Sequence, residues 1–240
     1  MSLPCRRADI AVIRRRHRGY VLLLTSTCLV LLLQPLAGWW PLLNPLAAIG
    51  LALVMMLFLT RFSPLRARRR LFYGLGTAAI AMELVWILAL ATYPALARHL
   101  SIPHLLIWVV FIVTFLLRKT RVLMREPYVT LSVVMGAAAG YLLIGYAGGF
   151  LLHTLLLWQP SGFDLALLPD GSAHTSDPLR DFPTMVLASF SSLTTLGTTI
   201  LRPGPLLSTT GGLVITLTGQ LYVAVLIGLI LGRFHRRGTG

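Results

Sequence analysis

Residues 182–200, FPTMVLASFSSLTTLGTTI, decide the fold because they are largely apolar yet too short to cross a membrane as one helix. The run 182–193 would make about three helical turns, whereas a bilayer span takes about 20 residues. Asp181 is suited to cap this short helix, and Pro183 would lie in its first turn, where proline is tolerated. The sequence therefore predicts a re-entrant segment, in which the helix dips into the membrane and 194–200 return against protein or a water-filled cavity.

Longer apolar runs surround this segment. Of the 240 residues, 56% are hydrophobic and 12% charged, against roughly 45–50% and 25% in soluble domains. This composition excludes soluble enzymes, disordered tails and coiled coils. The sequence predicts an all-α membrane protein of six transmembrane helices, with the re-entrant segment between the fifth and the sixth. The six predicted spans are 20–37, 41–60, 71–96, 102–117, 129–158 and 206–232.

The distribution of basic residues predicts the orientation in the membrane. The formal net charge is +14, and 18 of the 21 basic residues fall on one side of the predicted spans. That side is cytoplasmic by the positive-inside rule, so both termini are expected inside, and the charge leaves no reason to expect nucleic acid. Only Arg98, Arg180 and Arg202 fall on the other side. The cytoplasmic set comprises Arg6, Arg7, Arg14, Arg15, Arg16, Arg18, Arg61, Arg66, Arg68, Arg69, Arg70, Arg118, Lys119, Arg121, Arg125, Arg233, Arg236 and Arg237.

Other features of the composition concern the compartment. Arginine supplies 20 of the 21 basic residues, which is typical of a GC-rich bacterial genome, so we expect a multi-pass protein of a bacterial inner membrane. The first span is expected to be a retained signal anchor, because it is longer than an ordinary signal-peptide core and no A-x-A-like site follows it. Cys5 and Cys28 form neither a disulfide framework nor a zinc site.

The segment Thr194-Thr-Leu-Gly-Thr-Thr-Ile200 carries the predicted chemistry. A short helix followed by an extended Thr-Gly segment is how potassium channels place backbone carbonyls around an axis, where they replace the ion's hydration shell. Ser189–Gly197, SFSSLTTLG, resembles the pore helix and filter of a prokaryotic potassium-channel-like family. Gly219–Gly228, GQLYVAVLIG, resembles the inner helix of that family. The strong resemblance covers 182–234, and the remainder matches mainly in topology.

The resemblance implies a homotetrameric channel that passes monovalent cations, K⁺ or Na⁺, and needs no other cofactor. The inner cation site would use the hydroxyl of Thr195 and nearby carbonyls. The inner helix of the family often has a gating glycine, which Gly219 matches, although close helix packing is the alternative role. Gln220 beside it would line the pore or make an interhelical hydrogen bond. The implied filter residues are Thr194, Thr195, Leu196, Gly197, Thr198 and Thr199.

The filter departs from the family pattern Thr-Thr-Leu-Gly-Tyr-Gly-Asp in its outer half. This chain has Thr198 for Tyr, Thr199 for Gly and Ile200 for Asp. A β-branched residue opposes the positive φ that glycine supplies at the second of these positions. The loss of the tyrosine also removes a phenol that braces the filter. We therefore expect a weakly selective pore, because selectivity depends on the number and arrangement of coordinating dipoles.

Further features outside the filter also bear on the prediction. Glu83 is the only acid well inside a span, and protonation or pairing in the bundle is expected because no basic residue lies at comparable depth. His153, late in the fifth span, could tune a pH response but is no metal site alone. The fourth span has no arginine series, which argues against voltage sensing. Four glycines form two small-xxx-small pairs for helix packing: Gly136, Gly140, Gly145 and Gly149.

These features divide the predicted chain into four parts and give two functions. The parts are a basic cytoplasmic tail at 1–19, a peripheral four-helix bundle at 20–127, the pore domain at 128–234 and a short tail at 235–240. No ligand-binding domain is expected after the last span. The leading function is the pore-forming subunit of a tetrameric cation channel, and the alternative is a non-conducting regulatory subunit on the same scaffold. An enzyme is not expected, because no paired-histidine, Cys/His or Gly-x-Ser-x-Gly arrangement occurs.

Overall fold

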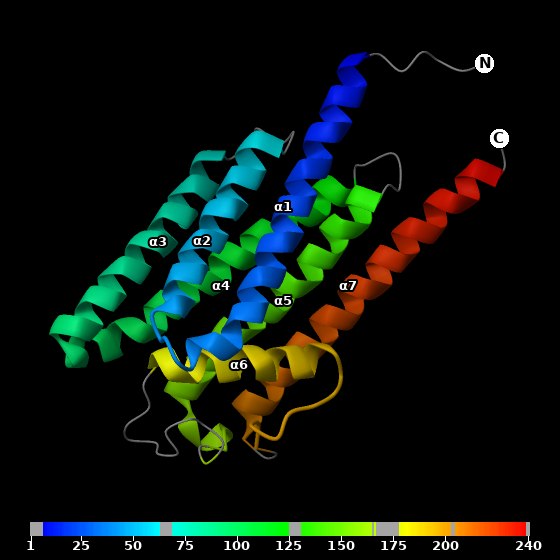
Figure 1. Ribbon diagram of the computed structural model, residues 1–240. Helices are drawn as coiled ribbons and strands as arrows, with labels where there is room; N and C mark the ends of the chain where they lie inside the picture. The colour runs from blue at the N-terminus through cyan, green and yellow to red at the C-terminus, as the bar shows by residue number, and fades with distance from the viewer. Residues whose placement is uncertain are drawn as a thin grey trace.

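The computed structural model describes residues 7–62, 69–124, 131–164, 166, 178–202 and 205–238 (Figure 1). Within these ranges every regular element is helical, and the only strand-like pairing is an isolated antiparallel bridge. The all-α fold class is therefore confirmed. The elements are α1 (Arg7–Ala37), α2 (Leu43–Leu57) continued by the π-turn η1 (Phe58–Phe62), α3 (Arg69–Thr92), α4 (Pro94–Met124), α5 (Leu131–Trp158), the short η2 (Pro160–Gly162), α6 (Pro178–Leu193) and α7 (Leu206–Gly238).

Six of these helices are long and apolar enough to cross a membrane: α1, α2 with its π-turn, α3, α4, α5 and α7. The chain is therefore a multi-pass membrane protein. The exception is α6, a helix of 16 residues that lies across one end of the bundle. Figure 1 shows α1 beginning and α7 ending at the opposite end of the bundle from α6, as an even number of passes requires.

Several predicted boundaries were wrong, and each error has a local cause. Helix α1 begins at Arg7 and α7 continues to Gly238, so helical structure extends beyond the predicted start of the first span at 20 and the predicted end of the last at 232. The short helix begins at Pro178 rather than 182, so Asp181 lies in its first turn and is not its cap. Proline fits the first turn of a helix, since the amide it lacks has no intrahelical partner there.

The fourth span was predicted too short. Helix α4 has 31 residues and includes Arg118, Lys119 and Arg121, which were expected in a cytoplasmic loop. The guanidinium of Arg118 lies 5.8 Å from the centre of the Phe72 ring, so its charge is compatible with a helical position beside an aromatic side chain. Lys119 is fully buried, and its Nζ has no hydrogen-bond partner. The third span ends at Thr92, four residues before the predicted boundary at 96, because Pro94 starts a new helix after Tyr93.

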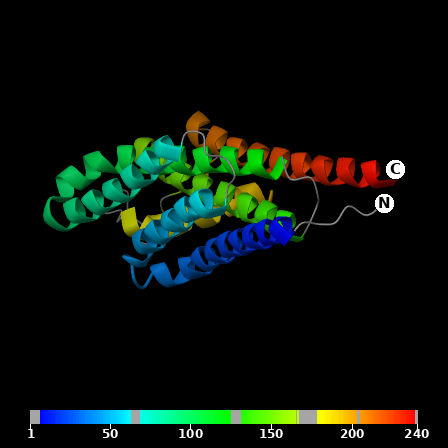
Figure 2. The same ribbon diagram turned by 90° about the horizontal axis from the view of Figure 1, so that it is seen from above.

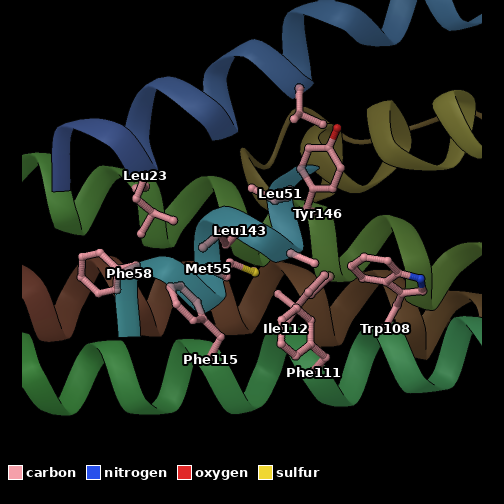
Figure 3. Packing of buried hydrophobic residues seen from close by; sticks show 14 of the residues in the cluster. Leu23, Leu51, Met55, Phe58, Trp108, Phe111, Ile112, Phe115, Leu143 and Tyr146 are labelled. Atoms are coloured by element: carbon pink, nitrogen blue, oxygen red, sulfur yellow. The ribbon is translucent and has the colours of Figure 1, made fainter. Parts of the chain in front are cut away.

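Aromatic and aliphatic side chains from α1, α2, α4 and α5 fill the main core (Figure 3). Phe58 packs edge-on against Phe115 with 5.9 Å between ring centres, and Trp108 stacks on Phe150 at 5.3 Å. Tyr146 accepts a hydrogen bond of 2.6 Å from the side-chain amide of Gln34. The core therefore joins the peripheral helices to α5 through direct ring contacts and a buried polar pair.

Helix α5 lies at the centre because its glycines let four other side chains approach its backbone. A Cβ atom at Gly136 would meet the ring of Tyr20 from α1 at 2.5 Å. At Gly140 it would clash with Tyr222 of α7, and at Gly145 it would lie 2.5 Å from the ring of Phe190 of α6. At Gly149 it would lie 2.9 Å from the Cα of Val186, also in α6. The predicted packing role of the four glycines is thus confirmed.

Helix α7 is the least covered of the six spans. It lies at the edge of the bundle (Figure 2) and packs on α5 and α6. Only 22% of its apolar window is buried by the rest of the chain, compared with 67% for α5. Leu213, Leu217 and Leu221 are each more than half exposed on it. One side of α7 thus faces a lipid environment or another protein chain.

The close contact between α5 and α6 predicts the effect of a single methyl group. Gly149→Ala should lower the free energy of unfolding by about 1–3 kcal/mol, because the new Cβ would meet both Cγ2 of Val186 at 2.7 Å and its Cα at 2.9 Å, and the Cα cannot rotate away. Thermal unfolding in detergent measures the change. Gly50→Ala is the control, since Gly50 is an exposed helical position with nothing within 4 Å of an added Cβ. It should be neutral or stabilising by up to about 1 kcal/mol, and equal losses in both variants would contradict the packing argument.

Candidate functional site

The C-terminal end of α6 is held by the two helices that flank it in sequence. The hydroxyl of Ser189 donates to the carbonyl of Gly145 in α5 at 2.8 Å. Thr216 of α7 donates to the carbonyl of Ser192 at 2.8 Å, and Tyr141 of α5 donates to the carbonyl of Leu193 at 3.2 Å. The last carbonyls of a helix have no partner inside it, so these bonds satisfy two of them and fix where 194–200 begin.

The predicted filter segment leaves this helix end as an exposed turn. The amide of Thr195 donates to the carbonyl of Ser192, and the amide of Gly197 donates to the carbonyl of Ser191. Leu196 is 83% exposed, and nothing lies within 4 Å of a Cβ built on Gly197. Thr194, Thr195 and Thr199 are also exposed, and Thr198 is half-buried. One chain therefore presents this segment at its surface and does not enclose it.

Left-handed backbone occurs at two positions of the segment. Among the described residues, positive φ falls at Thr195, with 61°, and at Gly197, with 77°. Glycine tolerates such an angle, whereas a β-branched residue there is an outlier. Thr199, which was expected to oppose a positive φ, is not among the residues with positive φ. The outer half of the segment thus avoids the backbone that its side chain opposes, and the unfavourable conformation lies at Thr195 instead.

A main-chain bridge, which no local sequence pattern predicts, holds the C-terminal end of the segment. Phe163, just after η2, pairs in antiparallel fashion with Leu201. The amide of Asp164 donates to the carbonyl of Ile200 at 2.7 Å, and the amide of Arg202 donates to the carbonyl of Gly162 at 3.0 Å. The ring of Phe163 is buried in the core between α5, α6 and α7, which anchors the bridge.

The side chains of Asp164 and Arg202 add little to this bridge. Their nearest atoms lie 3.3 Å apart, and both side chains are at least a third exposed. Exposed ion pairs contribute about 0–1 kcal/mol. The two backbone hydrogen bonds and the buried ring of Phe163 are therefore what hold the end of the segment in place.

The two predicted inner-helix residues have different surroundings. Gly219 lies against the end of α6, where an added Cβ would be 2.4 Å from Cδ1 of Leu193 and 3.4 Å from its carbonyl oxygen. This contact supports the close-packing role for Gly219. Gln220, the next residue, is exposed. It is open to a pore or to a neighbouring chain.

The predicted cation site is incomplete in one chain. The hydroxyl of Thr195 donates to the carbonyl of Thr194 at 2.6 Å, so its oxygen stays available to a cation. Thr194, Thr195, Leu196 and Gly197 are all exposed in the single chain, so this oxygen lies at the surface and is not enclosed. Among the described residues no three His, Cys, Asp or Glu side chains gather as a metal site.

Glu83 has partners that the sequence analysis missed. The expectation that no basic residue lies at its depth was wrong, because Nε2 of His104 lies 2.6 Å from Oε2 of Glu83. Trp108 donates to the same oxygen at 2.6 Å. Both partners belong to α4, and pairing of two residues 21 positions apart on different helices leaves no local pattern to detect. The predicted pairing of Glu83 inside the bundle is thus present.

Comparison with known proteins identifies no family for this chain. No protein-family model, curated protein or solved structure matches this chain. The functional assignment therefore depends on the residues of α6, α7 and the segment between them.

The left-handed backbone at Thr195 predicts a stabilising substitution. Thr195→Gly should raise the free energy of unfolding by about 0.5–1 kcal/mol, because glycine removes the steric cost of φ = 61° but adds chain entropy. Thr194→Gly is the matched control, since Thr194 has no positive φ and donates its hydroxyl to the carbonyl of Phe190. It should lose about 1 kcal/mol. Chemical denaturation in mixed micelles compares the two, and a loss in both would show that Thr195 carries no strain.

Proposed function

We propose that the chain is the pore-forming subunit of a homotetrameric, potassium-channel-like cation channel of a bacterial inner membrane. The observation that carries this proposal is the short α6, held at its C-terminal end by α5 and α7, leading into the exposed Thr194–Thr199 segment. In this proposal α6 is a re-entrant pore helix, and the carbonyls of the segment face a central axis. The resemblance of 182–234 to the channel family supports the same assignment.

The exposure of the segment and of α7 supports assembly from several copies. A filter needs oxygens on all sides of an ion, and one chain supplies a single strand of them. Four copies related by closed rotational symmetry would complete the ring and cover the apolar side of α7. Leu213, Leu217 and Leu221, exposed on that helix, would then face neighbouring subunits or lipid. The peripheral bundle of α1 to α4 would lie outside the pore.

The ends of the helices support the proposed orientation. Arg70 lies at the start of α3, and Arg118 and Arg121 lie in the last turns of α4; these helix ends lie at the end of the bundle opposite α6. A cytoplasmic position for that end agrees with the positive-inside rule, and α6 would then enter from the outer face.

The backbone of the segment supports weak selectivity. With negative φ at Thr199 and the exit fixed by the Phe163–Leu201 bridge, the outer carbonyls would not line up as the family's Gly-Tyr-Gly backbone aligns them. Fewer aligned dipoles discriminate less between K⁺ and Na⁺. The altered outer half is also the feature that favours the alternative function, a non-conducting regulatory subunit.

Reconstitution in planar bilayers tests the proposed function. With K⁺ on one side and Na⁺ on the other, the protein should carry a cation current whose reversal potential stays close to zero, because the outer carbonyl sites are lost. The combined change Thr198→Tyr, Thr199→Gly and Ile200→Asp should move the reversal potential toward that of K⁺. Ser161→Ala, an exposed change outside the segment, should leave it where it was.

Three results would contradict parts of the proposal. Strong K⁺ selectivity in the unaltered protein would show that the three substitutions were misinterpreted. The absence of current from preparations that are folded and tetrameric would favour the regulatory subunit. A stable monomer by native mass spectrometry, with the apolar side of α7 toward lipid, would remove the basis for a shared filter.

The orientation predicts opposite labelling at the two ends of the bundle. In a background lacking Cys5 and Cys28, Ser161→Cys should react with a membrane-impermeant maleimide in intact spheroplasts. Met124→Cys, exposed at the end of α4, should react only after the membrane is permeabilised, because that end carries the basic residues. Labelling of Met124→Cys alone in intact cells would reverse the proposed orientation.

A further inference from the structure

The bridge at the end of the segment also fixes the position of one carboxylate and one guanidinium. The amide of Asp164 donates to the carbonyl of Ile200 at 2.7 Å, and the amide of Arg202 donates to the carbonyl of Gly162 at 3.0 Å. Both residues are thus attached through their own main-chain atoms to the place where 194–200 end. Their side chains meet there, with Nη2 of Arg202 3.3 Å from Oδ1 of Asp164.

The backbone that carries Asp164 is held from two sides. Phe163, the preceding residue, is 1% exposed and packs in the core between α5, α6 and α7. A Cβ added to Gly162 would lie 2.6 Å from Oγ of Ser208, so η2 packs directly on the first turn of α7. The carboxylate therefore keeps its place beside Ile200, although the side chain of Asp164 is 35% exposed.

The charge of Arg202 alone would oppose cations at this place. Arg202 is one of only three basic residues on the predicted outer side, and it follows Ile200 by two positions. Its side chain is 55% exposed, so the charge faces solvent. A fixed positive charge lowers the local concentration of cations around it. Around a fourfold axis this charge would occur four times.

The carboxylate of Asp164 cancels that charge. Its Oδ1 accepts from Arg202 and also, at 3.4 Å, from the amide of Ala166. The pair contributes little to stability, because exposed ion pairs are worth about 0–1 kcal/mol and the backbone already holds the bridge. The main consequence of the pair is therefore electrostatic: it leaves no net charge from these two positions at the end of the segment.

We propose that Asp164 admits cations to the outer entrance of the pore by neutralising Arg202. This inference rests on the proposed function, because the entrance exists only where copies of the segment form a pore. Asp164 acts through Arg202 and is a positioning residue; a cation does not have to bind to it. Four intact pairs give an uncharged entrance, whereas the loss of either partner leaves a ring of four like charges.

Single-channel conductance at two salt concentrations tests this role. Charges at an entrance act over the Debye length, which is about 30 Å at 0.01 M salt and about 3 Å at 1 M. In about 0.01 M KCl, Asp164→Asn should lower the conductance at least about twofold, and Arg202→Gln should raise it at least about twofold. In 1 M KCl both variants should match the unaltered protein, because about 3 Å of screening length hides the charges.

The double variant separates a role of charge from a role in structure. Asp164→Asn combined with Arg202→Gln makes the entrance uncharged again, so its conductance should return to that of the unaltered protein at both salt concentrations. A structural role would instead leave the double variant at least as impaired as Asp164→Asn. The matched control is Arg98→Gln, which removes the same charge from an exposed position on α4, in the peripheral bundle. It should leave the conductance close to that of the unaltered protein.

The possible failures of this inference and of the proposed function differ. An unchanged conductance of Asp164→Asn in dilute salt, or a loss that persists in 1 M KCl or in the double variant, would overturn the role of Asp164 and leave the channel in place. The absence of current from every folded, tetrameric preparation would overturn the channel and this role together. If Asp164→Asn does not assemble, Arg202→Gln decides: a higher conductance in dilute salt supports the inference, and no change refutes it.

Discussion

The close approach of helices to the backbone of α5 is the constraint on which the other features depend. Where apolar lipid gives little driving force for helix association, small residues allow the contacts that hold helices together. The four glycines of α5 admit Tyr20, Tyr222, Phe190 and Val186 from α1, α7 and α6. Because two of these neighbours belong to α6, the same feature that builds the bundle also sets the position of the short helix and of everything that follows it.

The second constraint is that polar groups buried inside the bundle need hydrogen-bond partners. A helix that ends inside a membrane protein exposes carbonyls that lipid cannot hydrogen-bond, and here Tyr141 and Thr216 supply donors from the two flanking helices. The same requirement explains Glu83, which accepts a hydrogen bond from Trp108 and pairs with His104, both in α4. The unpaired nitrogens of His153 are notable against this background, because most other buried polar side chains nearby have found partners.

Hydropathy was sufficient to predict the six spans, the all-α class and the short helix, since each is a property of a continuous stretch of residues. Boundaries failed where charge was taken as a sign of a loop, as at Arg118 and Lys119 in α4. Contacts across the bundle were beyond prediction: the pairing of Glu83 with His104 and the bridge between Phe163 and Leu201 depend on the register of separate helices. The filter residues remain predictions, because their proposed role requires copies of the chain that a single subunit does not contain.

The bridge between Phe163 and Leu201 also has a mechanical meaning. It fastens two points 38 positions apart in sequence, so the chain from the end of α5 to the approach of α7 forms a closed ring that contains α6. Tension applied at the N-terminal end of α7 would reach the bridge at Leu201 before it reached Thr198, and the bridge would share it with Phe163, close to the end of α5. A change in the length of the connection before α6 would likewise leave Leu201 in place, because the bridge to Phe163 holds it independently of that connection. The exposed residues 194–197 are therefore tied to α5, the most buried of the six spans.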